Sequence, residues 1–407
     1  MPHYLDHSAT TPVRPEVAAV HAEELARVGN PSSLHAAGRR ARRRLEEARE
    51  ELAAALGAEP AEVLFTAGGT EADNLAVKGA AWAQGPGCRV LVSAVEHHAV
   101  LDAAAWLGEQ GHDVELLPVD GQGVVDLTVL ADRLARGPAT VVSVMWANNE
   151  TGVVQPVAEV ARLAREAGAV VHSDAVQAVA YLAVDFTDSG LDAMSVTGHK
   201  LGGPVGAGAL LARRELSLTP VHHGGGQERG VRSGTLDVAG ASALAHAVSL
   251  AVAERESEAA RLRGLRDRLV AGVQATVPGT RLTGDGAPRL PHLAHLTIEG
   301  TDADSLLLGL DMAGVHASAG SACQAGVQEA SYVLLAMGYS PAEARAALRF
   351  SLGRTSTEAD VDAVLHALPG VVASSRRANA VPRPGRPAGG RDTAPARSSV
   401  VVTAGDS

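Results

Sequence analysis

The chain has 407 residues, of which 46% are hydrophobic and 20% charged, and this is the composition of an ordinary globular protein with room for two or three domains. A formal net charge of −11 argues against nucleic acid or an anionic membrane as its main partner. Aromatic residues make up only 2% of the chain and give no stacking platform for single-stranded nucleic acid, and no apolar stretch is as long as a membrane helix. We therefore expect a cytoplasmic protein that binds neither nucleic acid nor a membrane directly.

Lysine and cysteine are both rare. Lys78 and Lys200 are the two lysines beside 33 arginines, and Cys88 and Cys323 are the two cysteines. Two cysteines exclude a disulfide framework and a four-thiolate zinc site, and they fit a reducing compartment. Each of these four residues is therefore a candidate reactive group, with a structural role as the alternative.

Short β-branched runs alternate with helical patterns from about residue 32 to residue 250, which predicts an α/β fold around a largely parallel sheet. The expected strands are Val63–Thr66, Arg89–Ser93, Val114–Val119, Thr140–Ala147, Val170–Asp174, Asp192–Val196 and Gly208–Ala212. The expected helices are His35–Leu56, Thr70–Ala83, Ala99–Gln110, Leu127–Arg136 and Val157–Ala167. Lys78 is expected to be a helix C-terminal cation.

The composition changes after residue 240, where a long charged helix over 241–276 precedes a second, smaller α/β region. Its expected elements are Leu293–Ile298, Asp302–Ala313, Ser331–Met337, Arg345–Leu352 and Glu358–Leu368. We expect an N-terminal segment (1–15) packed with the small domain, a large domain (16–255), a small domain (256–370) that carries the Cys323 loop, and a disordered tail (371–407).

The strongest candidate site follows the expected strand over 192–196. Lys200 lies there on a glycine-rich turn at the carboxyl end of a strand, where open α/β sheets bind ligands. A surface lysine is the usual interpretation of such a position, but this chain has replaced almost every other lysine with arginine. A lysine amine can lose its proton and form a Schiff base, whereas a guanidinium cannot. Lys200 is therefore predicted to react with a carbonyl group.

Two further segments fit a pyridoxal-phosphate site around Lys200. Asp174 ends the expected strand over 170–174 and either caps the next helix or places an anion at the pyridinium nitrogen, which lets the cofactor ring act as an electron sink. The turn Ala67–Thr70 leads from a strand into a helix and offers free N–H groups and a hydroxyl to a phosphate. This order, phosphate turn, Asp174 and then Lys200, resembles the fold-type I pyridoxal-phosphate enzymes.

Further motifs narrow the resemblance. They lie over residues 4–12, 29–33, 96–97, 148–152, 173–177, 197–200, 224–235 and 318–323. Together they are similar to the cysteine desulfurases, in the NifS/IscS-like branch of the class V aminotransferase-like enzymes, and the similarity covers residues 4–368. It implies a fold-type I transferase with a mostly parallel central sheet flanked by helices and a smaller α/β C-terminal domain.

The resemblance also implies a role for each matching residue. Lys200 is expected to hold pyridoxal 5'-phosphate and to move protons at the substrate, and His97 is expected to stack on the cofactor ring. The expected cofactor-binding residues are Gly69, Thr70, Asn148, Asp174, Gln177, Thr197, Gly198, His199 and Thr235. Thr235 is expected to come from the other subunit, which implies a homodimer. Asn30 and Arg349 are expected to bind the substrate carboxylate.

Cys323 is expected to carry the distinguishing step, in which its thiolate takes the sulfur of L-cysteine, alanine leaves, and a persulfide remains for a sulfur-acceptor protein. Its loop is small and rich in glycine, unlike the periodic apolar run around a core cysteine, which is the interpretation that suits Cys88. No resident metal is expected, because His97-His98 and His222-His223 lack matched ligand spacing. Transient binding of a nascent iron–sulfur cluster by Cys323 stays open.

Other functions are compatible with parts of this pattern. A selenocysteine lyase or a carbon–sulfur lyase on the same fold is the nearest alternative, followed by an aminotransferase and by a non-catalytic partner protein. The sulfur acceptor also stays open, since iron–sulfur assembly, tRNA thiolation, a thio-cofactor pathway and DNA modification fit the same active site.

Overall fold

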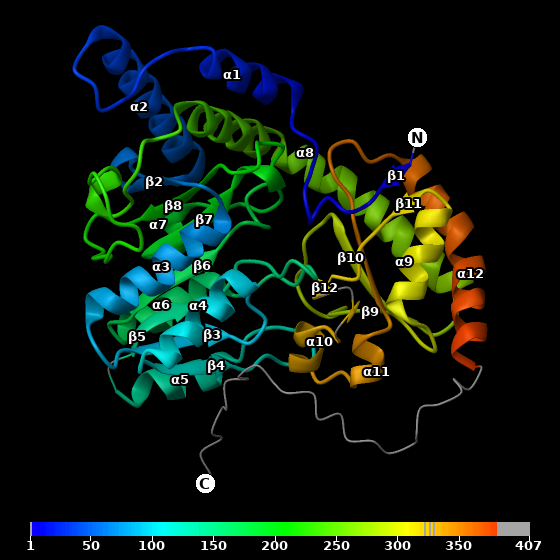
Figure 1. Ribbon diagram of the computed structural model, residues 1–407. Helices are drawn as coiled ribbons and strands as arrows, with labels where there is room; N and C mark the ends of the chain where they lie inside the picture. The colour runs from blue at the N-terminus through cyan, green and yellow to red at the C-terminus, as the bar shows by residue number, and fades with distance from the viewer. Residues whose placement is uncertain (1, 138, 321–322, 325–326, 329, 381–407) are drawn as a thin grey trace.

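The computed structural model describes residues 2–137, 139–320, 323–324, 327–328 and 330–380 (Figure 1). A seven-stranded sheet, here called the large sheet, has the order β2-β8-β7-β6-β5-β3-β4. Its strands are β2 (Val63–Thr66), β3 (Arg89–Ser93), β4 (Asp113–Leu117), β5 (Ala139–Ser143), β6 (Val170–Asp174), β7 (Ala193–Thr197) and β8 (Gly208–Ala212). Strand β8 is antiparallel to both of its neighbours, and the other pairs are parallel.

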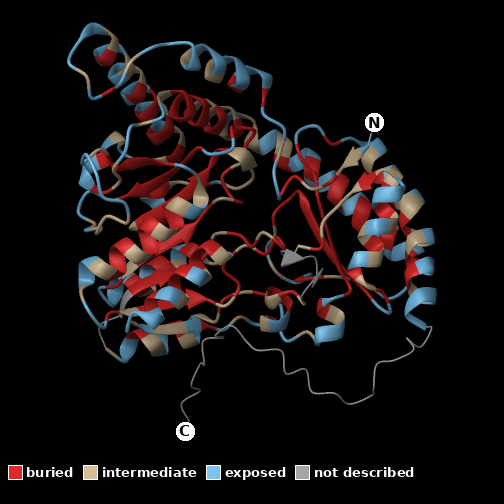
Figure 2. Ribbon diagram, in the orientation of Figure 1, coloured by how far each residue is buried: buried red, intermediate tan, exposed pale blue. Residues whose placement is uncertain are grey.

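Helices cover both faces of the large sheet (Figure 1). In β3, Val90 and Val92 pack with α3 (Gly69–Gln84) and α4 (His98–Glu109), whereas Leu91 packs on the other face. The helices of that second face include α2 (Ala36–Leu56), α5 (Leu127–Ala135), α6 (Val157–Glu166) and α7 (Phe186–Ser189). Because neighbouring residues of a strand point to opposite faces, these apolar runs are buried on both sides, as Figure 2 shows.

A second, antiparallel sheet, here called the small sheet, has the order β14-β10-β9. The strands outside the large sheet are β1 (His3–Tyr4), β9 (Thr280–Leu282), β10 (Leu293–Ile298), β11 (Val315–His316), β12 (Cys323–Gln324), β13 (Val327–Gln328) and β14 (Ala347–Ser351). The helices of this half are α9 (Ala303–Met312), α10 (Tyr332–Ala336), α11 (Pro341–Ala344) and α12 (Glu358–Ala380). Strand β1 pairs in parallel with β11, so the first residues of the chain lie in this half.

One long helix connects the two halves. Helix α8 (Val238–Thr276) packs its residues 241–251 into the core of the large sheet and its residues 262–273 into the core of the small sheet. Helix α1 (Pro15–Leu25) packs along α8, and three short 3-10 helices complete the described elements: η1 (Pro60–Glu62), η2 (Gly198–Lys200) and η3 (Glu228–Gly230). No helix in the described ranges is long and apolar enough to cross a membrane.

The α/β prediction with a mostly parallel sheet is confirmed, and all seven strands expected before residue 250 are present. The strand expected over Thr140–Ala147 ends earlier, at Ser143. The interpretation of Lys78 as a helix C-terminal cation is wrong, because α3 continues to Gln84 and the Lys78 ammonium lies 4.7 Å from the centre of the Trp106 ring. The exact domain boundaries stay predictions.

The expectation of disorder from residue 371 is wrong as far as Ala380, because α12 continues to that residue. Val372 and Ser375 extend the buried face of the helix beyond Pro369 at helical spacing. The Arg376 guanidinium also donates to the backbone carbonyls of Glu299 (2.9 Å) and Pro278 (2.6 Å). These contacts fix the last turns of α12, and residues 381–407 lie outside the described residues.

Candidate active site

A pocket of about 450 Å³ lies at the carboxyl ends of β6 and β7 and is also lined by residues of the small-sheet half. It brings together nine of the residues singled out from the sequence: Gly69, Thr70, His97, Asp174, Gln177, Thr197, His199, Lys200 and Arg349. Eleven further lining residues were not assigned a role from the sequence: Ser8, Ala9, Asp73, His98, Met145, Asn149, Glu150, Val176, Ser318, Gly320 and Tyr332.

Lys200 ends η2, directly after β7. Its Nζ donates to the backbone carbonyl oxygens of Ser8 and, at 2.7 Å, Ala9. Burial and the nearby Arg349 charge lower the pKa of Lys200 to about 8, although Asp6 and Asp174 oppose this shift. An amine with this pKa is available in its neutral, nucleophilic form near neutral pH.

Asp174 and His97 both line the pocket, and each influences the pKa of the other. Asp174 ends β6 and its Oδ1 accepts the N–H of Val176 at 2.8 Å. Burial raises the pKa of Asp174, while His97, this N–H and Lys200 favour its charged form. His97 caps α4, with its Nδ1 accepting the N–H of Ala99 at 3.1 Å, so the neutral ring carries its proton on Nε2. Burial lowers the pKa of His97, which agrees with a neutral ring.

The turn before α3 presents backbone N–H groups to the pocket. Helix α3 starts at Gly69 without a side-chain cap, and Gly68 has a φ of 140°, which favours glycine. Strand β8 runs against this turn so closely that a Cβ added at Gly208 would lie 2.6 Å from the Gly68 Cα. Uncapped N–H groups and the positive end of the helix dipole make this turn a suitable phosphate site.

Arg349 enters the pocket from β14 of the small sheet. Its Nη2 lies 2.7 Å from Asp6 Oδ1, its Nη1 donates to the carbonyl of Asn149 at 2.9 Å, and its buried Nε has no hydrogen-bond partner among the described residues. A guanidinium held this way can bind a small carboxylate. Lys200 and Arg349 are therefore two cationic groups from different halves of the fold that share one pocket.

Gln177 and His199 complete the wall beside Lys200. Gln177 Nε2 donates to the same Ser8 carbonyl that Lys200 uses, at 2.9 Å. His199 Nδ1 lies 3.4 Å from Thr10 Oγ1, and burial, followed by the Lys200 charge, lowers the pKa of His199 to about 4. Its ring is therefore neutral and able to donate or accept one hydrogen bond at each nitrogen.

The prediction that Asn148 reaches the cofactor is wrong, because its side chain makes hydrogen bonds to backbone groups instead. Its Nδ2 donates to the Val95 carbonyl at 2.9 Å, and its Oδ1 accepts from the N–H groups of Glu150 (3.0 Å) and Thr151 (2.8 Å). These bonds hold a turn that places Asn149 in the pocket wall, where Asn149 Oδ1 is buried with no described partner. The adjacent asparagine of the same motif, Asn149, is the one that lines the pocket.

Three other predicted residues do not line this pocket. Asn30 is exposed after α1, where its Oδ1 accepts the Ser32 N–H at 2.9 Å, so within one chain it cannot clamp a substrate here. Thr235 is exposed and lines a separate small cavity beside Gly240. Gly198 is buried, and a Cβ there would meet the Pro204 carbonyl oxygen at 3.0 Å.

Cys323 begins β12, which pairs with β13 in a short antiparallel hairpin. Its thiol lies outside the described part of the chain. The residues shortly before it, Ser318 and Gly320, line the pocket, and Ser318 pairs with Arg349. The backbone therefore leads from the pocket wall to Cys323. Cys88 is 6% exposed in an apolar core, which confirms its structural interpretation.

Buried carboxyl groups around the pocket were missed from the sequence. Asp73 follows Gly69 by four residues on α3, a helical spacing that could have indicated a shared face. Glu150 is 1% exposed, accepts the Ser331 hydroxyl at 2.6 Å and packs against Gly320. Burial raises the pKa of Glu150. Glu150 thus contacts the chain on both sides of the β12–β13 hairpin.

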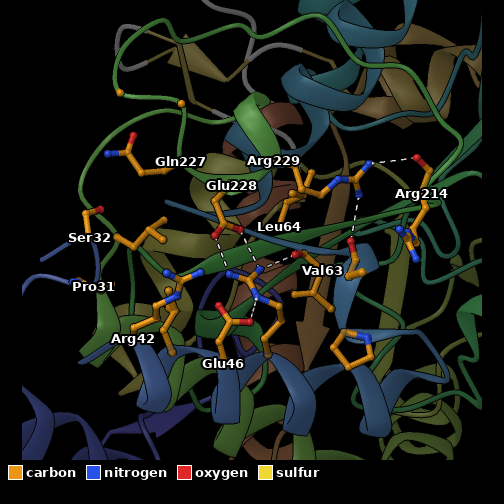
Figure 3. Close-up of a pocket in the computed structure, with 17 residues that line it drawn as sticks. Pro31, Ser32, Arg42, Glu46, Val63, Leu64, Arg214, Gln227, Glu228 and Arg229 are labelled. Atoms are coloured by element: carbon orange, nitrogen blue, oxygen red, sulfur yellow. Dashed lines mark hydrogen bonds and ion pairs between the residues drawn. The ribbon is translucent and has the colours of Figure 1, made fainter. Parts of the chain in front are cut away.

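A larger cavity of about 810 Å³ lies elsewhere, against α2, and Figure 3 shows its lining side chains. Its central feature is a buried ion pair in which Arg49 donates to Glu228 through Nη1 (3.0 Å) and Nη2 (2.7 Å). Arg49 also donates to the Val63 carbonyl, and Phe65 N–H to Glu228. Within the described residues, the hydrogen bonds of Arg229 go to backbone carbonyls. The Arg49–Glu228 ion pair and its backbone contacts therefore hold the loop before Thr235 on the large sheet.

Comparison with known proteins identifies the family. Residues 3–364 match the aminotransferase class-V family. An IscS-like cysteine desulfurase of Mycobacterium tuberculosis is 54% identical over 382 residues, which are 92% of this chain and 97% of the relative. The X-ray structure of a NifS-like protein from Rickettsia africae has a TM-score of 0.84 at 32% identity and covers 91% of this chain and 99% of its own. The structure of SspA in complex with cysteine has a TM-score of 0.76 at 32% identity, with 86% and 98% covered.

The family agrees with the geometry of the pocket, in which a lysine of lowered pKa, a buried carboxylate and a helix N-terminus converge. The similarity extends over both halves of the fold and reaches beyond the last strand of the small sheet. The chain therefore belongs to the aminotransferase class-V family and is a cysteine desulfurase of the IscS/NifS-like group.

Proposed function

We propose that this desulfurase holds pyridoxal 5'-phosphate on Lys200, takes L-cysteine as its substrate and transfers the substrate sulfur to Cys323. The observation that carries the proposal is the placement of Lys200, whose hydrogen bonds to the described residues go to backbone carbonyls and which lies in one pocket with Asp174 and Arg349. Its lowered pKa supports a role as a nucleophile toward a carbonyl.

The pocket suits this cofactor on two counts. The uncapped start of α3, with Gly69 and Thr70, suits a phosphate, and Asp174 suits a protonated ring nitrogen. When bound, pyridoxal phosphate supplies an aldehyde that condenses with amines and a ring that accepts electrons from the substrate. His97 is proposed to stack on the ring. The other proposed cofactor contacts are Gln177, Thr197, His199 and Asn149.

Arg349 is the proposed reader of the substrate carboxylate, since a guanidinium binds a planar carboxylate through two parallel hydrogen bonds. Binding there would place the substrate amine near Lys200, whose Nζ is the base proposed to take the proton from the substrate α-carbon. Ser8 and Ala9 orient Nζ through their carbonyls, and this limits the positions from which it can move a proton.

The sulfur step is proposed to occur at Cys323. The Cys323 thiolate attacks the substrate sulfur, so that a sulfur–sulfur bond forms as the carbon–sulfur bond breaks. The electron pair of the broken bond stays with the substrate carbon and is taken up by a proton. The balance is one cysteine and one enzyme thiol giving one alanine and one enzyme persulfide, with no external oxidant or reductant. A sulfur-acceptor protein then removes the outer sulfur by thiol exchange.

The assembly and location of the enzyme are also part of the proposal. Asn30 and Thr235 are exposed in this chain and do not line its own pocket, which is compatible with a homodimer whose partner completes each site. We propose a cytoplasmic homodimer, because a reactive thiol that must cycle through a persulfide needs a reducing compartment.

The decisive experiment measures alanine and protein-bound persulfide from L-cysteine with Cys323→Ser and, as the matched control, Cys88→Ser. The control is expected to retain both products and the Cys323 variant to lose both. Alanine formation at the wild-type rate by Cys323→Ser would contradict the persulfide mechanism, and pyruvate in place of alanine would favour a carbon–sulfur lyase. A strong preference for selenocysteine over cysteine would favour a selenocysteine lyase.

A further inference from the structure

Asp73 is a buried carboxyl group that the proposed mechanism does not use. It lies on α3, one turn after the phosphate turn, and lines the same pocket as Asp174 and Lys200. The residue is 1% exposed, and its Oδ1 has no hydrogen-bond partner among the described residues. A buried, unpaired carboxylate oxygen is strongly unfavourable, so the protonation state of Asp73 needs a physical account.

A polar layer behind Asp73 supplies hydroxyl groups but no positive charge. His172, on β6, lies between Ser143 Oγ and Ser195 Oγ, with 2.9 Å from each ring nitrogen to its hydroxyl. His172 Nε2 is 3.6 Å from Asp73 Oδ1. Burial lowers the pKa of His172 to about 3, so its ring is neutral. Asp73 therefore has no cation here to stabilise a negative charge.

The titratable groups that act on Asp73 from the neighbouring elements are all neutral or acidic. They are Glu96 after β3, and His172 and Asp174 on β6. Burial and the negative charge of Asp174 raise the pKa of Asp73 well above its usual range, whereas a hydrogen bond with the Ser195 side chain works in the opposite direction. Burial and the Asp174 charge thus act together to favour the protonated form of Asp73.

The surroundings of the two carboxyl groups differ. Asp174 accepts the Val176 N–H, and the Lys200 charge also favours its anionic form. Among the described residues, neither a backbone N–H nor a cation stabilises the Asp73 carboxylate. The surroundings therefore favour the protonated form of Asp73 more than that of Asp174.

We propose that Asp73 is a neutral carboxylic acid in the working enzyme and that, as an uncharged polar group in the same pocket, it helps to hold the Asp174 anion in position. It is a positioning residue, since it acts through the Asp174 anion that faces the cofactor nitrogen, and in this respect the inference rests on the proposed function. An ionised Asp73 would instead place a second negative charge beside Asp174 and disturb both its charge and its orientation.

This assignment can be tested with two variants that keep the branched shape of the side chain. Asp73→Asn keeps the size and a hydrogen-bond donor without an ionisable group, whereas Asp73→Leu is somewhat larger and removes every polar atom of the side chain. Each full-length variant is titrated with pyridoxal phosphate to obtain a dissociation constant. The visible absorbance of the loaded protein is then titrated with pH. Glu62→Gln, at a buried carboxyl away from the pocket, is the control.

Asp73→Asn is expected to stay within about twofold of the wild-type dissociation constant and to keep its spectral midpoint, and Asp73→Leu to bind about tenfold more weakly with a shifted midpoint. If Asp73→Asn loses as much affinity for pyridoxal phosphate as Asp73→Leu does, Asp73 works as an anion and the proposal is wrong. If Asp73→Leu keeps the wild-type dissociation constant and spectral midpoint, Asp73 has only a packing role and the proposal is wrong. Should Asp73→Leu not fold, the Asn variant alone decides, because a displaced midpoint contradicts a neutral Asp73 and an unchanged one supports it.

The outcome is separable from that of the proposed function. If wild-type protein develops no visible absorbance with pyridoxal phosphate and Lys200→Ala behaves identically, the cofactor proposal fails before Asp73 is tested. If the wild type develops the band and Lys200→Ala loses it, the Asp73 variants are interpreted as above.

Discussion

The Asp6 carboxylate holds the Arg349 guanidinium at 2.7 Å and so occupies one edge of the group proposed to bind the substrate. Asp6 comes from the segment after β1, and Arg349 comes from β14. The pair joins the first residues of the chain to the small sheet and keeps a buried cation partly neutralised at the pocket. Its removal should therefore act on substrate binding and on Lys200 together.

Asp6→Asn is expected to lower KM for L-cysteine by about two- to fivefold, because the substrate carboxylate no longer competes with a charged partner. The pKa of Lys200 should fall further, since the Asp6 charge raises it. Steady-state kinetics measure the first effect, and the pH dependence of the rate at which cofactor-free protein binds pyridoxal phosphate measures the second. A higher KM would instead mean that Asp6 orients Arg349 for the substrate.

Arg349→Lys should raise KM about ten- to a hundredfold with a smaller change in kcat, because an ammonium group cannot make the paired hydrogen bonds of a guanidinium. The nearby, exposed Arg354→Lys is the matched control and should leave KM unchanged. If the two variants change KM equally, Arg349 does not bind the substrate carboxylate.

The reaction of Lys200 with an aldehyde should depend on pH through its lowered pKa. The pKa of Lys200 is about 8, below the usual 10.5, because burial and Arg349 disfavour the ammonium form. The neutral amine is the reactive form, so the rate at which cofactor-free protein binds pyridoxal phosphate should rise with pH through about 8 and then level off. Arg349→Gln should move the midpoint upward. A rate that keeps rising toward pH 10.5 would contradict the shift.

Breaking the Arg49–Glu228 pair should destabilise the fold more than removing both charges. Glu228→Gln leaves the largely buried Arg49 guanidinium with only the half-exposed Glu46, at 3.2 Å, as a charged partner among the described residues, which lowers the free energy of unfolding by up to about 3–5 kcal/mol. Arg49→Met combined with Glu228→Leu should recover most of that loss. Denaturant unfolding measures both, with the exposed pair Arg43–Glu47 as a control whose removal should have little effect.

Gly208→Ala should weaken cofactor binding while the fold persists. The new Cβ would lie 2.6 Å from the Gly68 Cα and 2.9 Å from the Val196 carbonyl oxygen, so the phosphate turn must move away from β8. The dissociation constant of pyridoxal phosphate should rise at least tenfold, or about 1.4 kcal/mol. Gly264→Ala, in α8 where a Cβ meets nothing within 4 Å, is the control and should be neutral or stabilising.

The sequence predicts the large sheet and most of the pocket, because both depend on local patterns. Asp174 and Lys200 each end a β-branched run, and residues at the ends of adjacent parallel strands must lie close together. Gly69 is recognisable for the same reason, as the start of a helix after a strand. These assignments need no knowledge of the small sheet.

Residues that depend on packing between distant segments are harder to predict. Asn148 and Asn149 are identical in type, and only the turn that Asn148 builds with Val95 and Thr151 decides which of them faces the pocket. Asp73 looks like a polar residue of an exposed helix face until α3 is placed on β6 and β7. The end of α12 likewise depends on the carbonyls that Arg376 reaches from another part of the chain.

The pairing of β1 with β11, together with the Asp6–Arg349 pair, also sets an order of events during folding. Residues 3–9 are synthesised long before residues 315–351, so they wait without their native partners while the large sheet forms. Contacts between residues this far apart in sequence are slow to form, because a long loop must close first. The carbonyls that hold Lys200 therefore reach their positions late, and the ability to capture the cofactor should be among the last properties that the folding chain acquires.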